Sequence, residues 1–314
     1  MLNQAGKYIG PNEHLGHIYN SILKKLSPHG AIISVGTIRS IDRSARLRRA
    51  LGRGKTFLLD YDGVTTGFNE ALIDRLKAVP KRQALLSELF HGQVPPSTST
   101  GWKAKLAIDQ ATVGSGDVSP SWPGRKSILD PSHVASNFHT FATQPGTWRR
   151  SFLGSERLFG IAKAQAERGE LIAINGSIAG DHAMPDIAAA LHAGGEKVSV
   201  IDFSNALQYV FRQSPQGTIQ KVIENLERLP LADDAQILLT GLDYGKTREP
   251  SPWKYYAVAP KDFLAAARRG MFQHELSYQS FLQLARKHRK PGPAELVVPT
   301  ERFAAAIEAF RPPQ

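Results

Sequence analysis

The chain has 314 residues, a formal net charge of +11 and no cysteine. The lack of cysteine excludes disulfides, thiolate metal sites and cysteine nucleophiles. No apolar run approaches the roughly 18 to 20 residues that a membrane span needs, and the N-terminal stretch lacks a basic segment followed by an apolar core. We therefore expect a globular protein without a secretory signal, located in the cytoplasm.

Helical and strand patterns alternate along the first ninety residues. Apolar residues at helical spacing, or short β-branched runs between turn residues, distinguish the two. The expected elements are a helix over 13–26, a strand over 31–36, a helix over 42–51, a strand over 56–60 and a helical region over 69–90 that Pro80 interrupts.

Periodicity is absent between residues 91 and 150, where Pro, Ser and Gly are frequent. A segment this long without clear elements is unusual inside a compact domain. Trp102, Trp122 and Trp148 argue against plain disorder, because disordered composition is poor in aromatic residues. We expect an irregular insertion over the carboxyl edge of a sheet, where it would cover a substrate.

Regular patterns return after residue 150. Ser155 is placed to cap a helix and Gly169 to end it, while Pro185 and Gly194 bracket another. Further helices are expected over 205–211, 217–230, 262–270, 277–290 and 301–310, with strands over 171–176, 197–205, 235–242 and 254–260, the last antiparallel at an edge. About six strands, most of them alternating with helices, predict a single α/β domain over 1–314, Rossmann-like, with a mostly parallel sheet and helices on both faces.

The stretch FLLDYDGVTT places Asp60 at a strand end, with Asp62 two residues later. One interpretation is a phosphatase of the haloacid dehalogenase type, with Asp60 as nucleophile, Asp62 as acid/base and GDHAMPD (180–186) imitating a magnesium-holding motif. Two observations weigh against it. That motif does not follow a strand directly, and a strand and a helix precede Asp60.

The other interpretation is a nucleoside site. Gly36 ends a strand, and Asp60 ends the next strand 24 residues later. In this interpretation Asp62 and Gly63 begin the helix that follows. A glycine lets a ligand approach backbone N–H groups, and a carboxylate at the next strand tip accepts both ribose hydroxyls. The chain lacks G-x-G-x-x-G, which disfavours NAD and FAD but suits S-adenosylmethionine, because that cofactor has no phosphate. The alternative is a glycine and an aspartate at ordinary strand ends.

Two later strand tips carry polar residues. Asn175 and Gly176 follow one strand, where an adenine could be bound. The next strand ends in a polar group with a tyrosine close behind, made up of Asp202, Ser204, Asn205 and Tyr209. Parallel strands end at one sheet edge, where open α/β folds bind ligands. Equally, Ser204 or Asn205 could cap the helix that follows.

Several motifs together resemble a known family. They are GPNEHLGHIYNSIL, with Asn12 and Glu13 ahead of the first helix, FLLDYD, RQALLSELF, ENLERLPL and the long stretch 155–211, which ends in S-N-x-x-Q-Y. This set resembles a largely uncharacterised bacterial family with the class I S-adenosylmethionine-dependent methyltransferase fold. The chain departs from it at SVGTIRS, where the family usually has a glycine-rich turn with an acidic residue.

The resemblance implies S-adenosylmethionine as cofactor and, most simply, methyl transfer to a small molecule. The expected catalytic residues are Asp202 and Tyr209, with Glu13, His14 and His182 as further candidates and no metal. The expected cofactor-binding residues are Asn12, Glu13, Gly36, Thr37, Asp60, Tyr61, Asn175, Gly176, Ser204 and Asn205. Other chemistry on the same cofactor (non-methyl alkyl transfer or cyclisation), a non-catalytic binding protein and the phosphatase remain alternatives.

Positive charge is concentrated in 39–55 and 285–290. Arg43, Arg46, Arg49 and Arg53 fall on roughly one side of the expected helix. Such a patch can recruit an anionic substrate, or it can be a solvated helix face. No zinc-finger, RNP or basic-zipper pattern accompanies it, so nucleic acid is the less favoured partner. The sequence does not indicate an oligomeric state.

Overall fold

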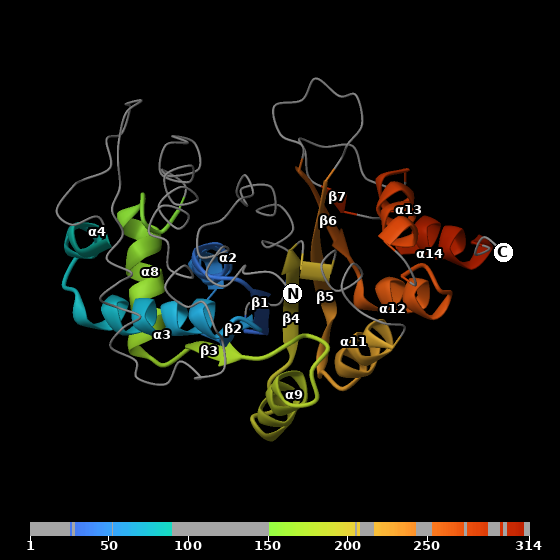
Figure 1. The fold of residues 1–314 in the computed structure, drawn as a ribbon. Coiled ribbons are helices and arrows are strands. Elements are labelled where there is room, and N and C mark those ends of the chain that lie inside the picture. Colours follow the sequence, from blue (N-terminus) through green and yellow to red (C-terminus); the bar gives the residue numbers. More distant parts are fainter. Residues whose placement is uncertain are drawn as a thin grey trace, which may run out of the picture. The chain divides into compact units, whose positions relative to one another are not determined.

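The fold was analysed in a computed structural model, which describes residues 26, 29–51, 53–89, 151–204, 206–207, 217–242, 253–272, 275–287, 296–297 and 300–310. Helices and strands alternate along these residues (Figure 1). The predicted helix over 13–26, apart from residue 26, and the predicted insertion over 91–150 lie outside them. So does the predicted helix over 205–211, apart from residues 206 and 207.

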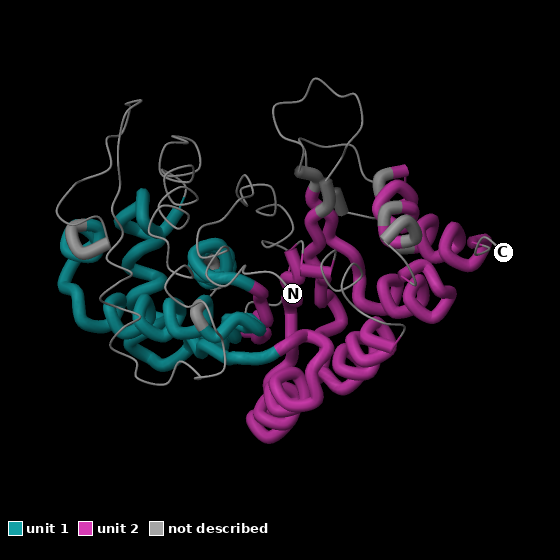
Figure 2. Tube along the Cα trace, viewed as in Figure 1, with its two compact units in different colours: residues 1–17, 36–176 teal, residues 18–35, 177–314 magenta. Residues whose placement is uncertain are grey.

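The chain divides into two compact units (Figure 2). Residues 1–17 and 36–176 form unit 1, and residues 18–35 and 177–314 form unit 2. Each unit is made of segments that are distant in the sequence. The prediction that the chain behaves as one domain stays a prediction.

In unit 1, two parallel strands are surrounded by four helices (Figure 1). Strand β2 pairs with β3 so that Asp60 lies opposite Asn175. The elements are α2 (Ile38–Leu51), β2 (Thr56–Asp60), α3 (Gly63–Ala78), α4 (Arg82–Leu89), α8 (Glu156–Glu167) and β3 (Leu171–Asn175). Helix α3 contacts both strands, and α8 contacts α2, α3 and α4.

Local signals set several of these boundaries as expected. The Ser155 side chain accepts the N–H of Leu158 and caps α8, and Gly169 follows the helix with a φ of +69°. A left-handed residue past a helix end is usually glycine, because glycine has no Cβ to clash. Pro80 lies between α3 and α4, as predicted. Helix α2 begins at Ile38, four residues earlier than expected.

The apolar core of unit 1 lies on one face of β2. Leu58 packs there against side chains from all four helices, among them Ile41, Leu76 and Phe159. Because side chains alternate along a strand, Thr56 and Asp60 share this face with Leu58. The face is therefore apolar in the middle and polar at both ends.

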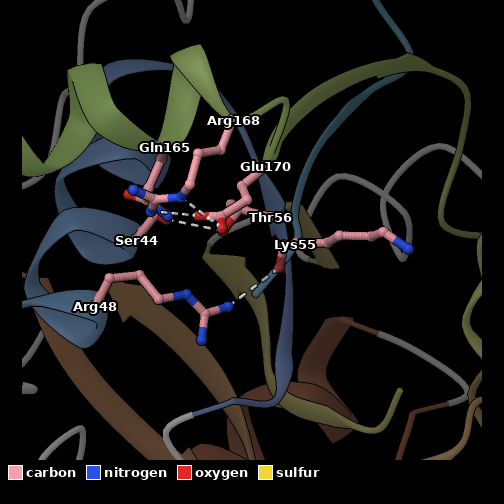
Figure 3. A network of polar contacts seen from close by, with 7 residues as sticks. All are labelled: Ser44, Arg48, Lys55, Thr56, Gln165, Arg168 and Glu170. Carbon is pink, nitrogen blue, oxygen red and sulfur yellow. Dashed lines mark hydrogen bonds and ion pairs between the residues drawn. The ribbon is translucent and has the colours of Figure 1, made fainter. Parts of the chain in front are cut away.

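A network of polar groups, most of them buried, lies at the amino end of β2 (Figure 3). The Thr56 hydroxyl lies 2.7 Å from the Ser44 hydroxyl of α2, which accepts a hydrogen bond of 2.7 Å from the Gln165 amide of α8. Arg168 donates two hydrogen bonds to the Glu170 carboxylate. Polar groups buried in this way must be hydrogen-bonded, so the network specifies how α2 and α8 meet β2.

The arginines of α2 correct the expectation of a solvated face. Arg39, Arg43 and Arg48 are buried. The Arg48 guanidinium lies against Gly54, where an added Cβ would come within 2.5 Å of it, and donates to the Lys55 carbonyl. Long arginine stems can cover apolar surface, which allows the helix to pack on both β2 and α8. Among the described members of the predicted patch, Arg53 is exposed and Arg46 is half-buried.

Asp42 is a fully buried carboxyl in the middle of α2. It accepts the N–H of Phe152, in the segment that leads into α8. Its other oxygen has no hydrogen bond among the described residues. Burial raises the pKa of Asp42 to about 7, although the Phe152 N–H and the positive charges of Arg46 and Arg43 act to lower it.

This shift predicts a pH dependence of stability. A carboxyl whose folded pKa is raised gives stability that is fully present below its unfolded pKa, 3.8, and lost as the pH rises to about 7. The free energy of unfolding changes by up to ~1.4 kcal/mol per pH unit in this range. Asp42→Asn keeps an acceptor for Phe152 but does not titrate. The free energy of unfolding of the variant, relative to wild type, should therefore increase with pH between about 4 and 7.

Urea denaturation at several pH values measures this difference. The exposed Asp233 provides a matched control. The free energy of unfolding of Asp233→Asn should depend on pH as that of wild type does. If the free energies of unfolding of wild type and Asp42→Asn change with pH in the same way, Asp42 is ionised throughout this range.

Unit 2 contains the other five described strands, in the order β1-β4-β5-β6-β7. Neighbours are parallel except β5 and β6, which are antiparallel as predicted. The strands are β1 (Ala31–Val35), β4 (Val198–Ser204), β5 (Leu231–Leu242), β6 (Trp253–Val258) and β7 (Leu296–Val297). The helices are α9 (Ala183–Ala193), α11 (Thr218–Glu227), α12 (Pro260–Arg268), α13 (Glu275–Lys287) and α14 (Thr300–Ala309).

Two expectations for these strands were wrong. Strand β5 begins four residues before the expected 235. Strand β6 is not at an edge, because the two-residue strand β7 pairs with it. The α/β class with a mostly parallel sheet is confirmed. None of the described helices has the length and apolarity to cross a membrane.

Stacked and tilted aromatic rings form the core between the C-terminal helices of unit 2. Phe263 of α12 lies 4.8 Å from Phe272, centroid to centroid, and Phe281 of α13 lies 5.5 Å from Phe303 of α14. Aromatic pairs at this spacing stabilise a core beyond the area that they bury. They hold the C-terminal helices together as one layer.

Strands β1 and β4 approach each other closely at Gly30. A Cβ added there would lie 1.7 Å from the Ser199 Oγ and 2.6 Å from its Cβ. Gly30→Ala should therefore lower the free energy of unfolding by about 1–3 kcal/mol through overpacking. Adding Ser199→Gly should restore part of the loss.

Gly160 gives a matched control, because nothing lies within 4 Å of a Cβ added there. It is inside α8, where Gly160→Ala should stabilise by about 0.5–1 kcal/mol. Denaturant unfolding of the three variants measures both effects. A Gly30→Ala variant as stable as wild type would contradict the close approach.

Candidate functional site

Three of the predicted ligand-binding residues meet in unit 1 at the carboxyl end of β2. Asp60 is the last residue of β2, and Asn175 is its partner at the end of β3. Gly36 lies beside them, since its N–H donates to the Leu59 carbonyl at 3.4 Å. The prediction that these residues share one strand end is confirmed within unit 1, and their role as ligands stays a prediction.

The main-chain carbonyl of Asp60 is held by three donors. The Gly176 N–H donates to it at 2.8 Å, the Thr66 hydroxyl at 3.3 Å and the Asn175 amide at 3.4 Å. These groups come from the turn after β3, from α3 and from β3 itself. The main chain of Asp60 is therefore held by groups from three different segments.

The carboxyl group of Asp60 is largely buried, with 6% of the residue exposed. Its Oδ1 accepts the N–H of Asp62 at 3.0 Å, and the N–H of Tyr61 also stabilises the carboxylate. Burial nevertheless raises the pKa of Asp60 to about 7, and the charge of Asp62 raises it further. The side chain of Asp60 turns towards the backbone that begins α3.

The second carboxylate oxygen of Asp60 is in a different environment. No hydrogen bond to Oδ2 occurs among the described residues, and the atom is not completely enclosed by them. Oδ2 is thus the oxygen that remains accessible at the strand tip. It can accept hydrogen bonds from a ligand.

Asp62 has a local structural role. Its Oδ2 accepts the hydroxyl of Thr65 at 2.9 Å, and its carbonyl accepts the N–H of Thr66, so Asp62 stands directly before α3. Aspartate is among the preferred residues at this position. The prediction that the helix begins at Asp62 and Gly63 is confirmed, since α3 starts at Gly63.

Tyr61 follows Asp60 and is 65% exposed, whereas the other large apolar side chains of the described residues are more covered. Asn175, also exposed, lies at the end of the adjacent strand. An exposed aromatic ring gives a flat surface on which a planar base can stack. Tyr61 therefore offers a stacking surface one residue after Asp60.

Gly36 makes the turn between β1 and α2 with a φ of +110°, which favours glycine. Among the residues that the structure describes, a Cβ there would meet only the Ser40 hydroxyl, at 3.8 Å, so these residues leave the space in front of this backbone open. The fully buried Asn69 of α3 donates to the Gly36 carbonyl at 3.1 Å. Sequence reasoning missed Asn69, because an asparagine inside a helical pattern carries no signal of its distant partner. Thr37 is buried next to the turn.

In unit 2, Asp202 joins the ends of β1 and β4. Its Oδ2 accepts the hydroxyl of Ser34 at 2.9 Å, and its Oδ1 accepts the N–H of Ser204 at 3.0 Å. Both carboxylate oxygens are occupied and the residue is 1% exposed. This arrangement is typical of a positioning residue and does not favour Asp202 as a general base.

Ser204 has a φ of +52°, and it is the one non-glycine residue with a positive φ among those described. The pairing of β4 with β5 shifts between Asp202 and Ser204, which marks a bulge at the strand end. Bulges and strained backbone are found disproportionately near functional sites. Whether Ser204 caps the next helix is not tested, because most of that helix lies outside the described residues.

The remaining predicted site residues fall into two groups. Asn12, Glu13, His14, Asn205 and Tyr209 lie outside the described residues. His182 is exposed ahead of α9, without a side-chain cap, and Asp181 forms an ion pair with Lys221. No cluster of three or more potential metal ligands of the His, Asp or Glu type occurs in the described part of the chain.

Asn225 of α11 is a second buried residue that sequence reasoning missed. Its amide donates to the carbonyls of Ile178 at 3.0 Å and Gly180 at 2.9 Å. It thereby fixes the turn that follows Gly176 in the sequence. The helical pattern of 217–230 predicted its element but not this contact, because the partner lies 45 residues or more away.

The fold and these strand tips define an α/β protein with polar groups at the carboxyl ends of parallel strands. The chain belongs to the family described as Domain of unknown function (DUF7790), whose model matches residues 8–289. No curated protein shows significant similarity to the chain.

The contacts of Asp202 predict the effect of removing the Ser34 hydroxyl. Ser34→Ala removes the hydrogen bond to a buried carboxylate oxygen, and we expect a loss of about 1–3 kcal/mol in the free energy of unfolding. Ser280→Ala, at an exposed position of α13, should change it by less than about 0.5 kcal/mol. Urea denaturation measures the free energy of unfolding of both variants. A Ser34→Ala variant as stable as Ser280→Ala would contradict a structural role for the Ser34 hydroxyl.

Proposed function

We propose that unit 1 binds the nucleoside part of S-adenosylmethionine at the carboxyl ends of β2 and β3. On this proposal the protein is an S-adenosylmethionine-dependent enzyme with a Rossmann-like fold of the class I methyltransferase type, most simply a methyltransferase that acts on a small molecule. The observation that carries the proposal is Asp60, with its backbone fixed and one carboxylate oxygen accessible at a strand tip.

The residues present fit an adenosyl group in three respects. Asp60 Oδ2 can accept the ribose hydroxyls, the exposed Tyr61 ring can stack on the base, and the open space at Gly36 lets a ligand approach the backbone. Asn175 is exposed at the end of β3, and its amide nitrogen already donates to Asp60 and Thr66, so its side-chain oxygen is the group left for the edge of the base. Open α/β folds commonly bind ligands at such strand ends.

The cofactor, when bound, supplies an electrophilic methyl group on its sulfonium. The role of the described residues would be to position it, since holding two reactants in line can account for much of the acceleration of a displacement. Asp60 would fix the ribose and Tyr61 the base. Asp202 would hold the ends of β1 and β4 in place, and Tyr209 stays a proposed catalytic residue.

A non-catalytic binding protein is the second candidate function. The observation in its favour is Asp202, whose two carboxylate oxygens already accept hydrogen bonds and which is almost fully buried. A residue in this state has little access to a proton of a substrate. Such a protein would bind the same ligand at Asp60 without a reaction, because a fold does not by itself imply activity.

Asp60→Asn tests the nucleoside site directly. The variant keeps the shape and one oxygen acceptor but removes the charge. Charge-assisted hydrogen bonds contribute about 1.5–3 kcal/mol each, so the Kd for S-adenosylmethionine should rise about tenfold to a few hundredfold. Isothermal titration calorimetry measures the change.

Asp74→Asn is the matched control, because Asp74 is exposed on α3 and pairs with Lys77. It should bind as wild type does. Equal affinity of Asp60→Asn and wild type would show that the nucleoside is not at Asp60. Magnesium-dependent phosphatase activity, lost in Asp60→Asn, would instead support the phosphatase interpretation.

A further inference from the structure

The outer edge of β3 is a feature of unit 1 that the proposed function does not use. We propose that two copies of the protein associate through this edge, with β3 of one copy antiparallel to β3 of the other and a two-fold axis at Ala173. The proposal is independent of the nucleoside site, because it concerns main-chain groups along the strand and not the side chains at its tip.

Strand β3 has a hydrogen-bonded neighbour on one side only among the described strands, namely β2. At one end of this pair the Thr56 N–H donates to the Glu170 carbonyl at 2.7 Å. At the other end the Gly176 N–H donates to the Asp60 carbonyl at 2.8 Å. In a parallel ladder, every second residue of a strand directs both its N–H and its carbonyl at the neighbour. The alternate residues direct theirs away from β2, and they are Leu171, Ala173 and Asn175.

These outward main-chain groups are unpaired in the described part of the chain. No hydrogen bond to the N–H or the carbonyl of any of the three residues is found there. Exposed edges of natural sheets are usually protected by lysine, proline or a bulge. The strand LIAIN contains no charged residue and no proline, and its register with β2 is regular along its whole length. The edge is thus open to pairing with a further strand.

The spacing of the outward groups fits a second copy of the same strand. When two copies run antiparallel about a two-fold axis at Ala173, this residue lies opposite the partner's Ala173. Leu171 then lies opposite the partner's Asn175. Both are hydrogen-bonded pairs, which exchange two N–H···O=C bonds each. Every outward N–H and carbonyl of the two strands is satisfied in this register.

The side chains of β3 are also compatible with their own copies. A two-fold axis brings identical side chains close together, which charged residues resist. The central residues of β3 are uncharged and half-buried, and they are Ile172, Ala173 and Ile174. In the proposed register Ile172 lies opposite the partner's Ile174, and branched side chains pack well against such neighbours. Strand β7, where the strand order of unit 2 ends, has only two residues and offers less to pair with.

The size of this interface determines how strong the dimer should be. An interface centred on one five-residue strand is smaller than the about 1,200–2,000 Å² that stable complexes bury. We therefore expect a dimer that dissociates on dilution through the micromolar range. Sedimentation velocity of the full chain measures this equilibrium, and the sedimentation coefficient should rise with protein concentration.

Ala173→Pro tests the main-chain pairing. Proline has no N–H, and its ring would lie where the partner strand must approach, whereas the N–H that it removes makes no bond to β2. The Kd of the dimer should rise about tenfold or more. Circular dichroism and urea denaturation should show that the variant remains folded.

Disulfide cross-linking tests the register without proline, because the chain has no cysteine of its own. One preparation carries Ile172→Cys and a second, with a longer tag, carries Ile174→Cys. The two positions face each other across the axis as a non-hydrogen-bonded pair, with Cα atoms about 4.5 Å apart, a separation that a disulfide can bridge. Mild oxidation of the mixture should link the two chains. Ala193→Cys, at an exposed position of α9, is the matched control and should not link to Ile172→Cys.

The outcomes decide between β3 pairing and its alternatives. Concentration-dependent association that Ala173→Pro weakens, together with the mixed disulfide, would support the proposal. A dimer that Ala173→Pro leaves unchanged and that forms no mixed disulfide would place the interface elsewhere and overturn it. A monomer at every concentration, without the mixed disulfide, would overturn it as well and leave the edge for a strand of another protein.

Discussion

The candidate site depends on how the main chain of Asp60 is held. Three donors from β3, the turn after it and α3 converge on one carbonyl, while the side chain turns back to the N–H groups that open α3. The same residue therefore ends a strand and helps to begin a helix. Oδ1 is occupied by the Asp62 N–H, so Oδ2 is the oxygen left as an acceptor, and the next residue, Tyr61, has an exposed ring.

Unit 1 also contains more buried charge than an ordinary core. Asp42 and three arginines of α2 are buried, together with Asp60 at the end of β2. Removing charged groups from water is costly unless other charges or hydrogen bonds compensate. The Asp42 carboxyl illustrates this cost, because its pKa is raised to about 7 despite two neighbouring arginines and a backbone donor. The raised pKa of Asp42 therefore predicts that the stability of unit 1 depends on pH in the neutral range.

The two clusters of polar strand-tip residues differ in character. At the end of β4, Asp202 has both oxygens occupied, and the strain at Ser204 is local to a bulge. At the end of β2, an oxygen and an aromatic ring remain accessible. The first arrangement resembles a structural clamp and the second a binding surface, although the sequence presents both in the same way, as an apolar run that ends in aspartate.

Local chemistry determined much of this protein from sequence alone. Ser155, Gly169, Pro80 and the Asp62–Gly63 pair ended or began their helices as expected, because caps and turn residues act over a few neighbouring positions. The strand tips at Asp60 and Asn175 were likewise predictable, since parallel strands end together.

Only the tertiary structure decided which charged groups are buried. Arg43 belongs to a sequence pattern that is typical of a solvated helix, yet α2 packs on β2 and α8 and encloses it. The contacts of Asn69 with Gly36 and of Asn225 with Ile178 join residues that are 33 and 47 positions apart. Local patterns contain no information about such partners, because burial and long-range hydrogen bonds arise only when distant segments pack together.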